Sequence, residues 1–281
     1  MQCLSPVKRV VVKEDGKHLV TFPCGHCEAC QENYKNDWAV RVKHELSCHK
    51  ESVFITLTYS DLHLSLQNLE YGRDRFNSLE KEELSLFIKR LRRSIEPLKI
   101  RFFASGEYGE KCTERPHYHV LIFGLSKDHD IFKNKVPVYR GGQIKYYYLN
   151  TPLWPHGHIE VSARIPDEKS AQYIAKYVAK KKGVSDKDYY KLRKILPEFL
   201  LMSRRPGIGY LGIKKHSDFY KSHPYGRIGS FKVKLPRYVL DKVEQFTDFD
   251  LRGQLNSDTR VYYTKNQKVV IRRKLYEKVK K

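Results

Sequence analysis

Two histidines lead directly into an apolar run in the stretch Arg115-Pro116-His117-Tyr118-His119-Val120-Leu121-Ile122-Phe123-Gly124. The β-branched and aromatic residues of this run predict a short buried strand. Because successive side chains of a strand point to opposite faces, His117 and His119 share one face and Tyr118 takes the other. Two imidazoles on one face can bind the same ion, so we predict a catalytic metal site on this strand.

A histidine pair of this spacing is weak evidence by itself, since the chain contains 12 histidines and short motifs recur by chance. A second pair does occur, in His156-Gly157-His158. It follows Trp154-Pro155 and lies at the start of a predicted strand, residues 157–164. We interpret His156 and His158 as structural or DNA-facing residues and not as ligands of the catalytic metal.

The charge of the chain indicates a polyanionic partner. Its 54 Lys and Arg residues outnumber 32 Asp and Glu residues, for a net charge of +22. Such an excess favours nucleic acid, where neutralisation of phosphates dominates affinity. The 20 Tyr, 13 Phe and 2 Trp residues offer stacking surfaces for unpaired bases. No apolar stretch reaches the 18 or more residues of a membrane span, so we expect a soluble, intracellular protein without a membrane partner.

Periodicity predicts the main helices and strands. Helices are expected over residues 31–49, over residues 77–95 with Asn77 as N-cap, over 166–183 and over 186–201. Strands are expected over 52–59, the expected centre of the sheet by its apolar composition, and over 99–107, 157–164 and 230–240. Residues 125–155 read as loops, and the basic segment 265–281 reads either as a DNA-binding helix or as a solvated one.

A carboxylate is expected beside the two histidines. Residues 109–115 form a turn between two predicted strands, which would then pair as a hairpin. The pairing brings Glu107 close to His117 and His119 and completes a set of two imidazoles and one carboxylate. Glu110 is the competing candidate for the same position.

Four cysteines near the N-terminus suggest a second kind of metal site. Cys24, Cys27 and Cys30 follow the spacing C-x2-C-x2-C, and Cys3 supplies a fourth thiolate. Four thiolates suit a closed tetrahedral Zn²⁺ site, and a reducing compartment favours metal over disulfides. Reduced thiols without metal, or an iron–sulfur cluster, are the alternatives. Spare candidate ligands are His26, His44 and Cys48.

The helix predicted over 166–183 carries the candidate nucleophiles. At 100° per residue, Tyr173 and Tyr177 share a face with Lys176 and Lys180. The small apolar residues Ala171, Ile174, Ala175 and Val178 lie on the neighbouring face and are expected to pack inward. A phenol ordinarily has a pKa near 10, and nearby lysines with a metal-held phosphate would favour the attacking phenoxide.

These motifs in this order resemble the HUH endonuclease superfamily of rolling-circle replication initiators. More closely, the chain resembles the replication initiation proteins of microviruses, the small single-stranded DNA bacteriophages, and of their gokushovirus-like groups. The stretches that carry the resemblance, which extends from Cys3 to about Tyr238, are Pro23 to Cys30, Gly106-Glu107-Tyr108-Gly109, Arg115 to His119, Tyr173 to Lys182 and Met202 to Gly209. One departure is Tyr118, which stands where the family usually has a bulky hydrophobe.

The resemblance implies an α+β fold, with an HUH endonuclease-like central antiparallel sheet flanked by helices. It divides the chain into a Cys-rich N-terminal segment and helix (1–49), an endonuclease core (50–184) and a basic C-terminal extension (185–281). Glu107, His117 and His119 would bind Mg²⁺ or Mn²⁺. Tyr173 or Tyr177 would attack a DNA phosphate, with Lys176 or Lys180 assisting charge and proton movement.

The same resemblance implies partners and a location. The substrate would be single-stranded DNA at the replication origin, contacted by Arg115 and by the basic turn that contains Arg204 and Arg205. Cleavage would leave a 5′-phosphotyrosyl bond and a 3′-hydroxyl that primes a host polymerase, with a host helicase opening the duplex. The protein would act in the cytoplasm of the bacterial host.

Two other functions compete with this interpretation. A cupin-type oxygenase also combines paired histidines with a carboxylate, but its glutamate usually follows a few residues later, and residues 120–127 contain none. A non-catalytic, zinc-containing DNA-binding protein would explain the cysteines and the charge without any nuclease chemistry.

Overall fold

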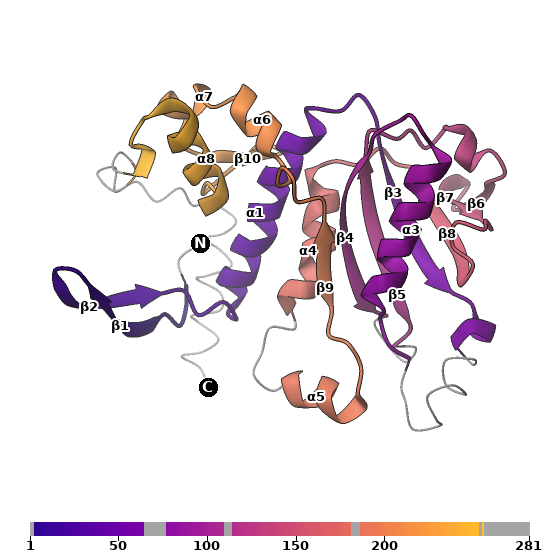
Figure 1. Ribbon diagram of the computed structural model, residues 1–281, viewed down its shortest axis with the longest axis horizontal. Coiled ribbons are helices and arrows are strands. Elements are labelled where there is room, and N and C mark those ends of the chain that lie inside the picture. Colours follow the sequence, from indigo (N-terminus) through magenta and orange to yellow (C-terminus); the bar gives the residue numbers. More distant parts are fainter. Residues whose placement is uncertain (1–2, 65–76, 110–113, 181–185, 253–254, 256–281) are drawn as a thin grey trace.

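The computed structural model describes residues 3–64, 77–109, 114–180, 186–252 and 255, without the side chains of residues 13, 177–180 and 186–188. Its centre is a seven-stranded sheet in the order β6-β7-β8-β3-β5-β4-β9, with every neighbouring pair antiparallel. Helices cover both faces (Figure 1). The predicted α+β class with an antiparallel sheet is therefore confirmed.

The strands of this sheet are β3 (Ser52–Tyr59), β4 (Arg101–Tyr108), β5 (Pro116–Phe123), β6 (Val136–Arg140), β7 (Gln143–Leu149), β8 (Gly157–Ser162) and β9 (Phe199–Met202). Two hairpins lie outside it, β1 (Val7–Lys13) with β2 (Gly16–Phe22) and β10 (Gly226–Ile228) with β11 (Phe231–Val233). The helices are α1 (Glu28–Leu46), α3 (Lys81–Ser94), η1 (Asp130–Phe132), α4 (Glu168–Lys180), α5 (Asp186–Arg193), α6 (Tyr210–Lys215), α7 (Phe219–Ser222) and α8 (Arg237–Thr247).

Alternation along β5 divides the core between the two faces of the sheet. Tyr118 and Val120 belong to the apolar cluster that includes the buried stripe of α3. Leu121 belongs to a second cluster with residues of α1 and α4, and His119 contacts Tyr173 of α4. The histidine strand therefore presents its imidazoles toward α4 and its tyrosine toward α3, as a period of two requires.

Helix α1 joins the sheet to the C-terminal helices. Its Val42 packs with the sheet and α4, whereas Ala39 and Val40 pack in a third cluster with residues of α6, α8 and the β10–β11 hairpin. Figure 1 shows α1 between these two parts, with the β1–β2 hairpin projecting from its start. Strand β9 comes from the segment predicted as a C-terminal extension, yet it forms an edge of the sheet; the three-part division of the chain stays a prediction.

Several predicted elements are confirmed. β3 is the middle strand of the sheet, β4 and β5 pair as the expected hairpin, and α3 buries its predicted apolar stripe. The residues of that stripe are Leu84, Phe87, Ile88, Leu91 and Ile95.

The start of α3 differs from the prediction. The N-cap is Glu80 and not Asn77. The backbone N–H of Glu80 donates to the hydroxyl of Tyr118 at 2.8 Å, and that hydroxyl also lies 2.9 Å from the Glu80 carbonyl. A phenol from the sheet thus binds the backbone where the helix begins, a tertiary contact that a local capping pattern cannot predict.

The prediction of loops over 125–155 was wrong. β6 and β7 form a hairpin there, and the two residues between them, Gly141 and Gly142, have φ values of 61° and 76°. Positive φ at both central residues suits a two-residue turn that matches the twist of the strands. The glycines were read as loop residues, although between strands they mark a hairpin.

Two C-terminal predictions were also wrong in part. Residues 186–201 do not form one helix, because α5 ends at Arg193 and β9 pairs with β4. Residues 230–240 contain only the short β11, and α8 begins after Pro236. The β1–β2 hairpin was not predicted, and segment 265–281 lies outside the described residues. Among the helices that the structure describes, none is long and apolar enough to cross a membrane.

Candidate active site and metal centres

The hairpin of β4 and β5 gathers three candidate ligands. Glu107 pairs directly with His117 in the ladder, and His119 lies two residues along on the same face. Oε1 of Glu107 lies 2.7 Å from Nε2 of His117 and 2.5 Å from Nε2 of His119. All three ligand atoms lie within 4.8 Å of one another. The structure thus brings together the set expected from the sequence, whereas Glu110 lies outside the described residues.

The other nitrogen of each ring is held by the sheet. Nδ1 of His117 donates to the carbonyl of Arg115 at 3.1 Å, which directs Nε2 toward Glu107. Nδ1 of His119 lies 3.0 Å from the hydroxyl of Thr56 on β3. Such contacts orient imidazole ligands in metal sites, so both Nε2 atoms are directed to one point.

Burial and the shared carboxylate set the pKa values of this group. Burial lowers the pKa of His117, but the hydrogen bond and charge of Glu107 outweigh it and raise the pKa overall. For His119, burial prevails over Glu107 and the pKa is lowered. Burial raises the pKa of Glu107, but the two histidines overcome this effect and lower it. Glu107 is therefore an anion, and His119 is a neutral imidazole at neutral pH, as metal ligands must be.

One polar atom supports a cation at this point. Oε2 of Glu107 is buried and, among the described residues, has no hydrogen-bond partner. A buried carboxylate oxygen without a partner is costly, and coordination by a metal ion would satisfy it. The donor set of two nitrogens and one carboxylate therefore fits a divalent ion.

Tyr173 of α4 lies against this group. Its ring and that of His119 are arranged edge to face with centroids 4.9 Å apart, and Phe54 of β3 packs on both rings. Helix α4 approaches the sheet closely because Ala171 and Ala175 are small and fully buried. The ring of Tyr173 keeps 42% exposure, so a phosphate in solvent can reach its hydroxyl.

The remaining predicted residues of α4 are only partly described. Lys176 follows Tyr173 by three residues and is half-buried, so it belongs to the neighbouring surface of the helix. The backbone of Tyr177 and Lys180 is helical, but their side chains lie outside the described residues.

Three residues near the site were not singled out from the sequence. Thr56 binds His119, and Glu160 on β8 pairs with Thr56 in the ladder and acts electrostatically on both histidines. Ser105 pairs with His119 and is fully buried, and its hydroxyl has no partner among the described residues. Alternation along β3, β4 and β8 could have found them, since it assigns all three to the face of His119.

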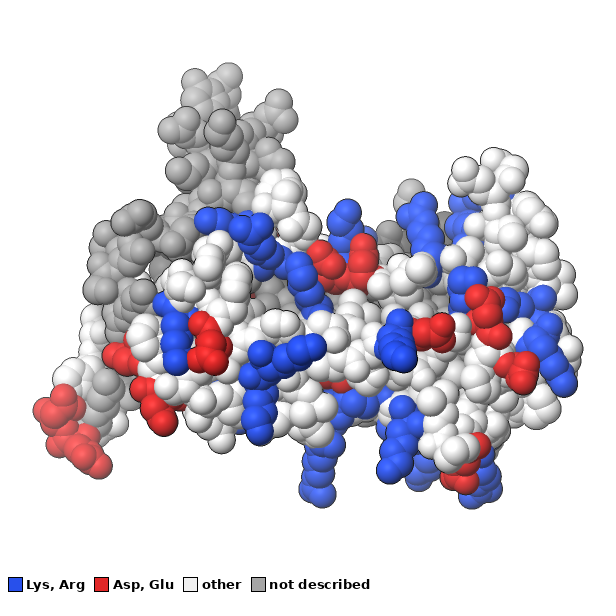
Figure 2. Space-filling view, turned by 90° about the horizontal axis from the view of Figure 1, so that it is seen from above, with Lys and Arg blue, Asp and Glu red and all other residues white. Residues whose placement is uncertain are grey.

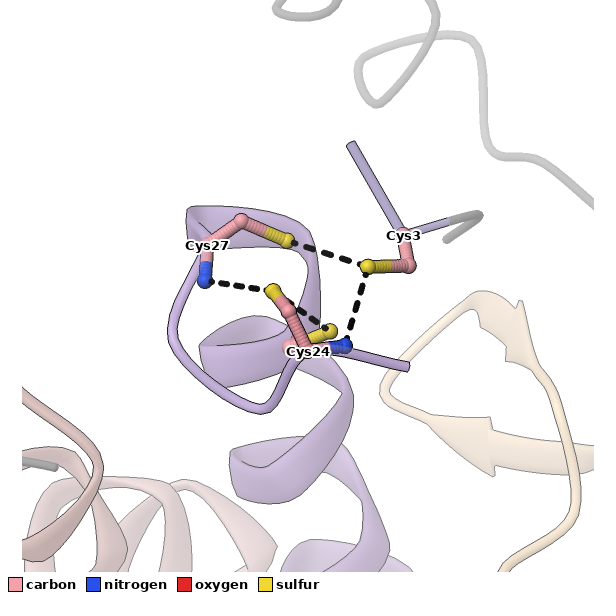
Figure 3. A group of neighbouring side chains, drawn as sticks. Cys3, Cys24 and Cys27 are labelled. Carbon is pink, nitrogen blue, oxygen red and sulfur yellow. Dashed lines mark hydrogen bonds between the residues drawn. The ribbon is translucent and has the colours of Figure 1, made fainter. Parts of the chain in front are cut away.

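The four cysteines predicted as a zinc site also come together. Figure 3 shows Cys3, Cys24 and Cys27 around the start of α1. The Sγ atoms of Cys3 and Cys27 are 3.8 Å apart, and those of Cys24 and Cys30 are 4.0 Å apart. Two thiolates on tetrahedral zinc, with Zn–S bonds of about 2.3 Å, are separated by roughly 3.8 Å. The sulfur positions therefore fit a zinc ion between them.

Backbone amides favour thiolates in this cluster. The N–H groups of His26 and Cys27 donate to Sγ of Cys24 and lower its pKa. Burial raises the pKa of Cys27, but the N–H of Leu4 and neighbouring donors lower it to about 6. Burial raises the pKa of Cys30 to about 12. At least two sulfurs are thus prepared to bind a cation, and a metal would have to displace the proton of Cys30.

The spare candidates are not part of the cysteine cluster. His44 bonds to the hydroxyl of Tyr220 at 2.6 Å, and Cys48 donates to the carbonyl of His44. Both lie near the far end of α1, roughly 25 Å away at 1.5 Å per residue. His26 contributes its backbone N–H to Cys24, and its imidazole is not one of the grouped ligands.

The predicted DNA-binding arginines differ in their surroundings. Arg115 forms an ion pair with Asp61 and donates to the carbonyl of Tyr59 at 3.4 Å. Arg204 and Arg205 are exposed in the turn after β9. Figure 2 shows Lys and Arg side chains spread across one whole face of the molecule, with acidic groups interspersed. The basic charge is thus distributed over the surface, and DNA contact by these three arginines stays a prediction.

Comparisons with known proteins agree with this geometry. Residues 52–182 match the family model of the phage replication-associated protein ORF2. The chain is 31% identical over 286 residues to the replication-associated protein VP4 of Bdellovibrio phage phiMH2K, covering 92% of this chain and 83% of that protein. It is 32% identical over 232 residues to the replication-associated protein ORF2 of Spiroplasma virus 4, covering 80% of this chain and 68% of that protein. No solved structure matches the chain.

The chain therefore belongs to the replication-associated protein ORF2 family of small single-stranded DNA phages. A further relative is the replication-associated protein ORF4 of Chlamydia phage 1, which is 30% identical over 180 residues, covering 59% of this chain and 41% of that protein. The resemblance to microvirus replication proteins that the motifs indicated is confirmed at the level of this family.

Proposed function

We propose that this protein is an HUH endonuclease that nicks single-stranded DNA at the phage replication origin and starts rolling-circle replication. The observation that carries the proposal is the contact between Tyr173 and His119, because it combines a solvent-accessible phenol with a candidate metal ligand. Membership in a phage replication family supports the same activity.

Glu107, His117 and His119 would hold Mg²⁺ or Mn²⁺ through Oε1 or Oε2 and the two Nε2 atoms. The bound ion would supply Lewis acidity to the scissile phosphate and offset its charge. Thr56 and the carbonyl of Arg115 keep the imidazoles oriented, so the ligands need little rearrangement.

Tyr173 would act as the nucleophile. Its Oη attacks the phosphorus, a new P–O bond forms, and the bond from phosphorus to O3′ of the preceding nucleotide breaks. The phenolic proton leaves to water and O3′ takes up a proton, so the products are a 5′-phosphotyrosyl bond and a free 3′-hydroxyl. The positive charge of Lys176 near this surface would favour the phenoxide.

The covalent bond keeps the energy of the phosphodiester. Attack of a 3′-hydroxyl on the phosphotyrosine reverses the first step and rejoins the DNA without ATP. Tyr177, one turn along α4, would provide the second nucleophile for cleavage after a round of synthesis, with Lys180 in a supporting role. Arg115, Arg204 and Arg205 would contact the backbone of the single strand.

The 3′-hydroxyl would serve as a primer for a host polymerase, and a host helicase would separate the strands, both in the bacterial cytoplasm. The four cysteines would hold a structural Zn²⁺ that ties Cys3 to the start of α1. This zinc would organise the N-terminal segment and take no part in cleavage.

The competing functions have less support. Cupin folds are double-sheet jelly rolls or barrels, whereas the described residues form one open sheet with helices on both faces. A non-catalytic zinc-containing DNA-binding protein would explain the cysteines, but it would need neither the buried acid Glu107 between two histidines nor a tyrosine against them.

The decisive experiment is detection of a covalent adduct. The protein is incubated with a labelled single-stranded origin oligonucleotide, with and without Mg²⁺ or Mn²⁺, and resolved on a denaturing gel. We expect a metal-dependent band that carries label at the mass of protein plus the 3′ fragment. DNA binding without cleavage or adduct, at any metal concentration tried, would favour the non-catalytic alternative.

A further inference from the structure

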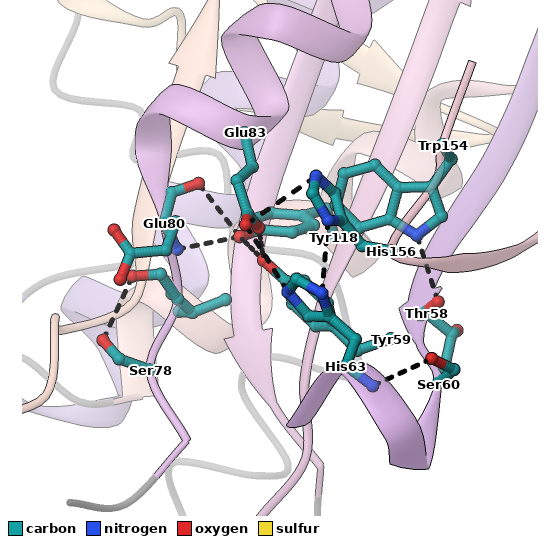
Figure 4. A network of polar contacts seen from close by, with 11 residues as sticks. Thr58, Tyr59, Ser60, His63, Ser78, Glu80, Glu83, Tyr118, Trp154 and His156 are labelled. Carbon is teal, nitrogen blue, oxygen red and sulfur yellow. Dashed lines mark hydrogen bonds and ion pairs between the residues drawn. The ribbon is translucent and has the colours of Figure 1, made fainter. Parts of the chain in front are cut away.

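A second group of two histidines and one glutamate lies on the opposite face of the sheet. His63 belongs to a helical turn after β3, His156 precedes β8, and Glu83 is in the first turn of α3. One ligand atom from each residue lies within 4.8 Å of the other two. Figure 4 shows the three side chains directed toward one another beside Tyr59 and Trp154.

The distances in this group leave room for an ion. Oε1 of Glu83 lies 3.6 Å from Nε2 of His63 and 3.8 Å from Nε2 of His156. These separations are too long for hydrogen bonds. They approach the separation of roughly 3.3 Å between neighbouring ligands on tetrahedral zinc with Zn–N bonds of about 2.05 Å. Nε2 of His63 is also buried and has no hydrogen-bond partner among the described residues.

Neighbouring groups orient these three side chains. The hydroxyl of Tyr59 donates to Oε2 of Glu83 and leaves Oε1 facing the histidines. The ring of Tyr59 stacks on that of His63, with centroids 5.1 Å apart and an angle of 7°. Trp154 packs edge-on against His156 at 4.9 Å. A carboxylate and two imidazoles fixed by outer contacts are the arrangement found in metal sites.

The group is also accessible. The side chains of His63 and His156 are each 22% exposed, and that of Glu83 is 17% exposed. Burial lowers the pKa of His156, so this imidazole is neutral at neutral pH and able to bind metal. An ion could therefore enter from solvent, and a water molecule would complete its coordination.

We propose that His63, Glu83 and His156 bind a second divalent metal ion of the zinc class. Two imidazoles and one carboxylate suit Zn²⁺ better than Mg²⁺, which prefers oxygen ligands. The site is distinct from the one on β5, because it lies on the face of the sheet that Tyr118 occupies. Its existence does not depend on the proposed nuclease activity.

The site would fasten three segments that are distant in the sequence. It joins the end of β3, the start of β8 and the first turn of α3. The hydroxyl of Tyr59 lies 2.6 Å from that of Tyr118, which stands between the two histidines of β5. Zinc bound to Glu83 would thus stabilise the strand that carries His117 and His119 from behind.

The test uses the full-length His117→Gln variant, in which the site on β5 is already impaired. Zn²⁺ binding is measured by equilibrium dialysis and elemental analysis, before and after adding His156→Gln. We expect the double variant to bind one equivalent less. The matched control is His158→Gln in the same background, because this histidine lies two residues away and stacks on Tyr148 outside the group. It should leave the stoichiometry unchanged.

A second measurement covers the case in which His156→Gln does not fold. Glu83→Gln keeps the size of the side chain but removes its charge. Zn²⁺ should raise the midpoint of thermal unfolding of His117→Gln, and the added Glu83→Gln should abolish that part of the shift. Equal stoichiometry with and without His156, or an unchanged thermal shift after Glu83→Gln, would overturn the proposal.

Discussion

The rings of Tyr173 and His119 lie edge to face, with centroids 4.9 Å apart. Tyr173 belongs to α4 and His119 to β5, so this contact is made by the packing of a helix on the sheet. The small buried residues Ala171 and Ala175 allow the helix to come this close. The proposed nucleophile and a proposed metal ligand are therefore neighbours before any DNA is bound.

The first prediction concerns Tyr173. Replacing it with phenylalanine removes the hydroxyl but keeps the ring against His119, so the fold and the metal ligands should be retained. We expect Tyr173→Phe to abolish the adduct of the first cleavage on a denaturing gel. Tyr177→Phe should impair the second cleavage, and the double variant should form no adduct at all.

The control for this series is Tyr139→Phe. Tyr139 is 62% exposed on β6, away from α4, and its loss should leave the adduct unchanged. Adduct formed by the Tyr173→Phe, Tyr177→Phe double variant would show that the nucleophile is misassigned.

The second prediction concerns Glu107. Glu107→Gln keeps the volume of the side chain but removes the negative charge between the two imidazoles. Because loss of even an outer contact to a metal ligand weakens binding about 10–100-fold, we expect at least this loss of Mn²⁺ affinity, and cleavage should fall with it. Affinity for the single-stranded oligonucleotide, measured by fluorescence anisotropy, should change little. The matched control is Glu160→Gln on the same face, which should weaken Mn²⁺ binding much less.

Much of this site could be predicted because its parts are local. His117 and His119 share a face by strand alternation, and a short turn brings Glu107 opposite His117. Both relations follow from periodicity and hairpin pairing within one stretch of chain. The face of α4 that carries Tyr173 followed from helical spacing in the same way.

The contacts that were missed depend on the tertiary fold. His63, Glu83 and His156 come from three separate segments, and no spacing in the sequence relates them. The N-cap of α3 was misassigned because a hydroxyl from β5 binds Glu80. In each case the deciding partner is remote in sequence, and local propensity carries no information about it.

The third prediction concerns Tyr118, on the reverse of the histidine strand. Its hydroxyl accepts from the N–H of Glu80 and contacts the hydroxyl of Tyr59. Tyr118→Phe leaves these buried groups without a partner, which should lower the free energy of unfolding by about 1–3 kcal/mol. Urea denaturation followed by circular dichroism measures the change. The exposed Tyr139→Phe should be neutral, and an equal effect of both variants would contradict the role of the hydroxyl.

The fourth prediction concerns the cysteine cluster. Cys24→Ser removes one thiolate from the group of four, so protein purified with a reductant should contain one zinc fewer per chain by elemental analysis. Cys48→Ser is the matched control, since Cys48 is an exposed cysteine near the other end of α1. Equal zinc content in wild type and Cys24→Ser would contradict a zinc site at these cysteines.

The fifth prediction concerns pH and Glu45, a buried residue of α1. Its carboxylate accepts from Arg101 of β4, from the N–H of Gly209 at 2.6 Å and from His49. Burial raises its pKa, but these partners outweigh burial and hold the pKa below the ordinary value of 4.5. The native state therefore favours the ionised form, and the group contributes stability above its unfolded pKa that is lost as the pH falls through its folded pKa.

Glu45→Gln should lower the free energy of unfolding at pH 7 by about 3–5 kcal/mol, because Arg101 keeps a largely buried charge without its partner. The difference from wild type should shrink as the pH is lowered below 4.5, the ordinary value of this carboxyl. Urea denaturation of both proteins at a series of pH values measures it. A difference that stays constant across that range would mean that ionisation of Glu45 does not hold α1, β4 and the turn at Gly209 together.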